Sequence, residues 1–270
     1  MMSYYAHLRV QSMAELNLAI RLSALKLPFR QSLESAARLG ATSVEIDARS
    51  EIHPSQISDT GLRQLKKMLD DLNLRVASLR FPTRRGYDAI DDLDRRVDAT
   101  KDAMSLAYRL GAPVVVNAIG QVPEDDSDPR RETLLEVMDD LGRHGAKVGS
   151  FLCAETGSES GECLANLLNS HQESFVGVAF NPGQLIINRF SASEAIDALK
   201  GRIQIVYAID GVLDLAAGRG IAVPLGLGSA DFPELLGKLE DHQYQGRFVV
   251  GRTGSHPSEI SQDIQHLRDL

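Results

Sequence analysis

The sequence predicts a (β/α)8 barrel that forms a single domain over residues 1–270. Eight short apolar runs alternate with eight longer amphipathic stretches, at the spacing of roughly 30 residues that a βαβ unit needs. Strands that alternate with helices form parallel sheets, and eight units in 270 residues fit a closed barrel. An open doubly wound sheet usually carries a glycine-rich phosphate loop after its first strand, and Leu22–Leu27 contains no such loop.

Start and stop signals place the elements of the first half. Pro28 lies near the start of the first predicted helix and Gly40 lies just past its end, while Ser58 can cap the second helix and Gly111 ends the third. Strands are expected at 16–22, 42–47, 74–79 and 113–117, and helices at 28–39, 58–72, 90–110 and 129–144.

The same alternation continues through the second half without a linker or low-complexity tract. Strands are expected at 146–154, 175–180, 202–209 and 247–250, and helices at 161–169, 192–199, 231–239 and 257–270.

Composition excludes several classes of protein. The net charge is −8, and the longest basic cluster is the pair Arg84–Arg85, whereas nucleic-acid binders usually show a basic stripe. The two cysteines, Cys153 and Cys163, are too few for a disulfide framework. No signal-peptide core and no apolar run of ~18 residues is present. We therefore expect a cytoplasmic protein that binds neither nucleic acid nor a membrane.

In a (β/α)8 barrel the site lies at the C-terminal ends of the strands. Polar residues at these ends can simply face solvent, because the loops there meet water. Glu155 is a stronger candidate for a functional residue, because it ends an otherwise apolar strand. The other polar residues at these ends are Asp47, Arg49, Arg80, Asn117, Asn181, Gln184, Tyr207, Asp210 and Arg252.

Six segments in order resemble the xylose isomerase-like barrels, a family that includes sugar-phosphate isomerases, ketohexose epimerases, inosose dehydratases and apurinic endonucleases. The segment at 36–47 ends in Val-Glu-Ile-Asp, 154–157 reads Ala-Glu-Thr-Gly, and 178–184 contains Asn-Pro-Gly-Gln. The remaining segments lie at 206–210, 224–232 and 247–251. The resemblance implies the barrel and a divalent metal, which in the family is Mn, Mg, Co or Zn.

The resemblance also implies which residues would hold that metal, and most of them are replaced. The family's Glu, Asp, His and second Glu correspond to Glu155, Asn181, Tyr207 and Gly251, and an accompanying His corresponds to Gln184. Hard cations require charged oxygen ligands, which amides do not supply, and a protonated Tyr is a poor ligand. We therefore expect no metal and no other cofactor, although Asp210 with Glu155 leaves an alternative pair of ligands open.

The first hypothesis is an isomerase or epimerase of a sugar, sugar phosphate or sugar acid. Glu155, the carboxylate retained from the family pattern, is the expected catalytic base. Amides, carboxylates and guanidinium groups nearby can bind the hydroxyls or the anionic group of such a substrate. Arg252, beside the lost second Glu, could supply the charge that the metal would otherwise provide. The expected substrate-binding residues are Asn181, Gln184, Tyr207, Asp210 and Arg252.

The second hypothesis is a non-catalytic barrel that binds a carbohydrate-like small molecule or acts as a partner subunit. An apurinic endonuclease is disfavoured, because that branch uses several histidine ligands and the net charge of −8 opposes DNA. The substrate and the homo-oligomeric state are left open.

Overall fold

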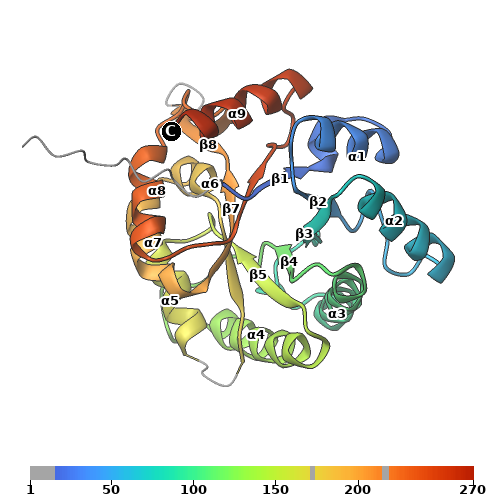
Figure 1. Cartoon of the computed structure of the whole chain (residues 1–270). Helices are drawn as coiled ribbons and strands as arrows, with labels where there is room; N and C mark the ends of the chain where they lie inside the picture. Colours follow the sequence, from blue (N-terminus) through green and yellow to red (C-terminus); the bar gives the residue numbers. More distant parts are fainter. Residues whose placement is uncertain (1–15, 171–173, 215–218) are drawn as a thin grey trace, which may run out of the picture.

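The computed structural model describes residues 16–170, 174–214 and 219–270. Within them, eight parallel strands close into a barrel (Figure 1), which confirms the predicted fold class. Neighbours around the barrel follow chain order from β1 to β7, and β10 closes the ring between β7 and β1. The strands are β1 (Leu18–Arg21), β2 (Ser43–Asp47), β3 (Arg75–Arg80), β4 (Val114–Asn117), β5 (Phe151–Glu155), β6 (Gly177–Phe180), β7 (Ile203–Ala208) and β10 (Arg247–Val250).

Helices are arranged around the barrel (Figure 1). They are α1 (Phe29–Arg38), α2 (Asp59–Asp71), α3 (Leu93–Leu110), α4 (Pro129–Val148), α5 (Gly161–Asn169), α6 (Pro182–Ile187), α7 (Ala192–Leu199), α8 (Phe232–Asp241) and α9 (Pro257–Asp269). Short 3₁₀ helices follow β1 at Leu22–Leu25 and precede β7 at Lys200–Arg202.

The core has two layers, because successive side chains of a strand point to opposite faces. The larger layer lies between strands and helices, and the smaller one fills the barrel. Cys153 and Tyr207 belong to the inner layer, so the alternation along β5 also directs Glu155 inward. Burial raises the pKa of the Cys153 thiol, which keeps it neutral in this apolar setting.

The largest boundary error concerns the fifth strand. The sequence predicted a strand from residue 146, whereas α4 continues to Val148 and β5 begins only at Phe151. Gly149, with φ of 87°, ends the helix in the left-handed conformation and donates its backbone N–H to the carbonyl of Gly145.

Two elements on the C-terminal side of the barrel were not predicted. One is the antiparallel ribbon of β8 (Asp210–Asp214) and β9 (Arg219–Val223). The other is α6, which follows β6 directly and packs against β8. The two backbones approach so closely that a Cβ on Gly211 would lie 2.7 Å from the Gly183 carbonyl oxygen.

Across the described residues, no helix combines the length and the apolar character needed to cross a bilayer.

Candidate functional site

Polar side chains from six strand ends meet inside the mouth of the barrel, above the apolar inner layer. They form a connected network, which we call the mouth network. Its members are Arg21, Glu45, Ser78, Arg80, Glu155, Asn181 and Tyr207.

Glu45 is the most deeply buried carboxylate of the mouth network, with no exposed surface. Its Oε1 accepts a hydrogen bond from Arg21 Nε at 2.7 Å. Its Oε2 accepts from Ser78 Oγ at 2.9 Å and from Tyr207 OH at 2.7 Å. Three donors therefore compensate the desolvation that this charge suffers inside the barrel.

Tyr207 lies between the group around Glu45 and the group around Glu155. The guanidinium carbons of Arg21 and Arg80 lie 4.7 Å and 5.9 Å from the centre of its ring, distances at which cation–π attraction operates. Burial, followed by the nearby Glu45 carboxylate, raises the pKa of Tyr207 well above its usual range. The phenol is therefore protonated at neutral pH and donates a hydrogen bond to Glu45.

Glu155 sits at the end of β5 with both carboxylate oxygens engaged. Its Oε2 lies 2.8 Å from Arg80 Nη1, and its Oε1 accepts from Asn181 Nδ2 at 2.9 Å. Burial opposes the charged form of Arg80, but Glu155 and the other acidic groups nearby outweigh it and raise the pKa of the guanidinium. Arg80 is thus a permanent cation held against Glu155, the residue that the resemblance aligns with the family's first metal-ligating Glu.

Asn181 caps α6 and is positioned by its neighbours. Its Oδ1 accepts from the backbone N–H of Gln184 at 3.1 Å, and its own N–H donates to Thr156 Oγ1 at 2.8 Å. These contacts leave Nδ2 directed at Glu155. Gln184 is half-buried on the first turn of α6, where its Cβ packs against Gly157.

The structure directs Arg252 away from the mouth network. Its Nη2 lies 2.8 Å from Glu259 Oε2, at the N-terminus of α9. The positive charge beside Glu155 is therefore supplied by Arg80 of β3 rather than by Arg252.

Asp210 likewise uses its carboxylate elsewhere. It has no exposed surface, and its two oxygens accept four backbone N–H groups at 2.8–3.2 Å, which belong to Gly211, Gly226, Gly228 and Ala230. This side chain ties the start of β8 to the loop before α8.

Other rim residues named from the sequence have contacts within loops. Asp47 Oδ1 accepts the backbone N–H groups of Arg49 and Ser50. Asn117 Nδ2 donates to Thr83 and Tyr87, at 2.9 Å each.

The residues present do not fit the family's metal. Among the described residues, no group of three or more His, Cys, Asp or Glu side chains is placed to hold an ion. Glu155 is neutralised by a guanidinium, and Asp210 is occupied by backbone groups. Gly251 has φ of +115°, and a Cβ added there would lie 2.9 Å from Ala24 Cβ, so a Glu at this position would require the neighbouring backbone or Ala24 to shift.

Sequence reasoning missed Arg21, Glu45 and Ser78 as members of the network. A signal for these residues was present in the sequence, because each strand carries a charged residue next to apolar ones. Glu45 lies within β2, and Arg21 is the last residue of β1. Because such residues are rarely buried without a partner, the two opposite charges could have been paired.

Another buried carboxylate, that of Glu159, lies in the loop between β5 and α5. It is 5% exposed, and among the described residues its one hydrogen bond is long, at 3.5 Å from the backbone N–H of Val122. Burial, with a smaller contribution from Asp88, raises the pKa of Glu159 from 4.5 to about 7.

This shift predicts a pH dependence of stability. The folded state holds the Glu159 proton more tightly than the unfolded state, so the stabilisation is complete below pH 4.5 and is lost as the pH rises to about 7. Relative to Glu159→Gln, the wild-type free energy of unfolding should fall by up to about 3 kcal/mol between pH 4.5 and 7.5. Urea unfolding of both proteins across this range measures the difference, and parallel pH profiles would contradict it.

Comparisons with known proteins agree with the geometry of the barrel. The family model described as xylose isomerase-like TIM barrel matches residues 33–270. No curated protein sequence matched the chain.

Several solved structures share the fold. A xylose isomerase domain protein from Planctomyces limnophilus has a TM-score of 0.80 and 20% identity over 94% of both chains. A xylose isomerase-like TIM barrel protein from Mycobacterium smegmatis, in complex with magnesium, has a TM-score of 0.73 and 15% identity over 93% of this chain and 95% of that one. D-psicose 3-epimerase with D-tagatose, from Clostridium cellulolyticum H10, has a TM-score of 0.72 and 15% identity over 94% of this chain and 97% of that one.

Proposed function

The chain belongs to the xylose isomerase-like TIM barrel family, and on that premise we propose that its barrel mouth binds a carbohydrate-like ligand without a divalent metal ion. The observation that carries the proposal is the ion pair of 2.8 Å between Arg80 and Glu155. A guanidinium there supplies the positive charge that the family obtains from a metal. The sugar class is supported by structural neighbours such as the epimerase crystallised with D-tagatose.

The mouth network offers the groups that a polyhydroxylated ligand needs. Glu155 can accept hydrogen bonds from hydroxyls, and Asn181 and Arg80 can donate. Arg21 contributes a further donor, because its Nη2 is buried without a hydrogen-bond partner among the described residues. A ligand oxygen that reached Nη2 would satisfy this donor, which otherwise costs desolvation energy.

Binding of a sugar panel in the presence of EDTA tests the proposal. The panel contains monosaccharides, sugar acids and sugar phosphates, and thermal shift followed by calorimetry measures Kd. We expect at least one of these ligands to bind equally well with EDTA and with Mn²⁺. Glu155→Gln should weaken binding about tenfold or more, because it removes a charge-assisted hydrogen bond.

Glu162→Gln is the matched control, since Glu162 is an exposed carboxylate on α5 and its loss should leave Kd unchanged. Binding that requires Mn²⁺ would refute the metal-independent mode. Binding that survives Glu155→Gln unchanged would place the ligand elsewhere.

The adjacency of Glu155 and Arg80 also favours a second candidate, a metal-independent isomerase or epimerase. Glu155 would take a proton from the carbon beside a substrate carbonyl, and the electron pair would move into an enediolate whose oxygen faces Arg80. Return of the proton would complete the reaction. Turnover of the bound sugar in EDTA, reduced at least about a hundredfold by Glu155→Gln, would support this candidate. Binding without turnover would leave only the first proposal standing.

A further inference from the structure

We propose that an arginine-lined cleft beside the barrel mouth is a binding site for a phosphate group, distinct from the mouth network. The cleft has a volume of about 560 Å³. It lies between the loops that follow β2 and β3 and the start of α3, on the side of the barrel where sites form. Its basic lining residues are Arg49, His53, Arg84, Arg85, Arg95 and Arg96.

The positive charge of this cleft is not balanced by the acids that line it. Arg85 pairs with Asp91 at 2.7 Å. The other four arginines have no carboxylate within 4.0 Å in the described part of the chain. Asp92 and Asp102 also line the cleft, so five guanidinium groups face three carboxylates. This local excess of positive charge contrasts with a net charge of −8 for the chain.

Backbone carbonyls hold two of these guanidinium groups in place without neutralising them. Arg49 Nη1 donates to the Pro82 carbonyl at 3.0 Å, and its guanidinium carbon lies 5.8 Å from the centre of the Phe81 ring. Arg96 donates to the carbonyls of Ala89 and Asp91. Its Nε is buried without a partner among the described residues. Guanidinium groups fixed in this way retain N–H donors that match the oxygens of a phosphate.

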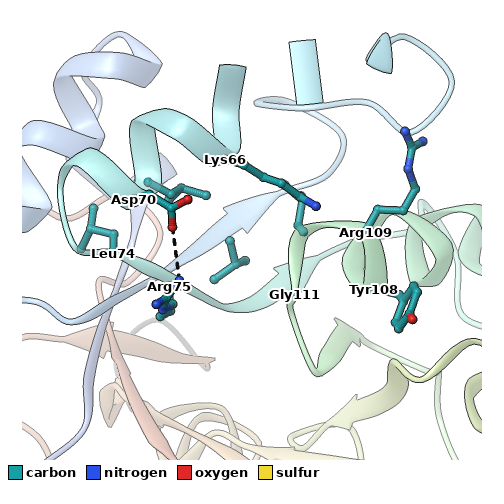
Figure 2. Close-up of a pocket in the computed structure, with 10 residues that line it drawn as sticks. Lys66, Asp70, Leu74, Arg75, Tyr108, Arg109 and Gly111 are labelled. Carbon is teal, nitrogen blue, oxygen red and sulfur yellow. Dashed lines mark hydrogen bonds and ion pairs between the residues drawn. The ribbon is translucent and has the colours of Figure 1, made fainter. Parts of the chain in front are cut away.

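A second cation-lined cleft at the opposite end of the barrel provides a contrast. Figure 2 shows this cleft, of about 370 Å³, between α2, the start of β3 and the end of α3. Its two arginines have carboxylate partners, since Arg75 bonds Asp70 at 3.2 Å and Arg109 bonds Asp59. Lys66 lies between them on the wall formed by α2. Paired arginines make this cleft a matched control.

Titration of the full chain with inorganic phosphate at low ionic strength tests the site. The double variant Arg84→Ala/Arg95→Ala should bind phosphate at least about tenfold more weakly than the wild type, because each lost guanidinium removes charge-assisted bonds. Both side chains are exposed, so the fold should be retained, which an unchanged Tm would confirm. The double variant Lys66→Ala/Arg109→Ala removes the same charge from the other cleft and should bind as the wild type does.

Absence of phosphate binding by the wild type, or equal loss in the two double variants, would overturn the site. Glu155→Gln should keep its affinity for inorganic phosphate, so this test does not depend on the proposed function. Comparison of glucose 6-phosphate with inorganic phosphate then distinguishes the source of the group. Tighter binding of the sugar phosphate identifies a phosphate carried by a larger ligand, and equal binding identifies free phosphate. Both outcomes support the cleft.

Discussion

Replacement of Glu45 by leucine is expected to lower the free energy of unfolding by about 3–5 kcal/mol, the usual cost of removing one partner of a buried ion pair. The substitution leaves the Arg21 guanidinium, 6% exposed, without its carboxylate. It also removes the acceptor of the Ser78 and Tyr207 hydroxyls. Urea unfolding followed by circular dichroism, with the midpoint and slope fitted together, measures the loss.

Two comparisons make this prediction specific to a buried charge. The double variant Arg21→Met/Glu45→Leu should recover part of the stability, because apolar residues can replace a buried ion pair at little cost, while the Ser78 and Tyr207 hydroxyls still lack their acceptor. Glu34→Leu, which breaks the exposed pair of Arg30 and Glu34 on α1, should cost less than about 1 kcal/mol. A loss below about 1 kcal/mol for Glu45→Leu, or no recovery in the double variant, would contradict the account.

The mouth network bears on the proposal that the ligand binds without a metal ion. A metal site needs carboxylates that are free to coordinate, whereas the two carboxylates of the mouth network, Glu45 and Glu155, are hydrogen-bonded to protein donors. The charged side chains therefore hold one another in place, and the site that we propose for the ligand is ordered by protein contacts alone. Such preorganised donors reduce the cost of ordering the site when a ligand binds.

Local rules were sufficient to predict the barrel. Hydrophobic periodicity located its eight strands, and capping signals such as Ser58 and Gly111 set helix ends to within a few residues. The error at the fifth strand arose because Ala146 to Val148 are compatible with either element, and packing together with the Gly149 turn extended the helix.

The site could be predicted only in part, for a physical reason. The rule that strand ends converge correctly brought Glu155 and Asn181 together. It could not pair Arg80 with Glu155, because contacts across a barrel depend on strand stagger and tilt, which sequence patterns do not fix. The direction of Arg252 was equally hidden, since it depends on the position of Glu259 in the first turn of α9.

Asp210→Ala is the second substitution with a large expected effect, although the sequence named Asp210 as a substrate-binding residue. Its removal leaves four backbone N–H groups without their acceptor. At about 1 kcal/mol for each N–H group, we expect a loss of roughly 3–4 kcal/mol, because water can reach some of these groups. The backbone of Gly228 passes so close that a Cβ there would lie 2.0 Å from Asp210 Oδ1, which leaves little room for rearrangement.

Asp231→Ala provides the matched control, because Asp231 caps α8 and accepts a single backbone N–H, that of Glu234, at 3.1 Å. Loss of one such cap should cost about 1 kcal/mol. Amide hydrogen exchange separates the two roles of Asp210: a loop anchor predicts faster exchange at Gly226, Gly228 and Ala230 in Asp210→Ala. A variant with wild-type stability and unchanged exchange, but weakened sugar binding, would instead restore Asp210 to the ligand site. Unfolding stability and amide exchange of Asp210→Ala, compared with Asp231→Ala, therefore decide whether the Asp210 carboxylate holds the loop or binds the ligand.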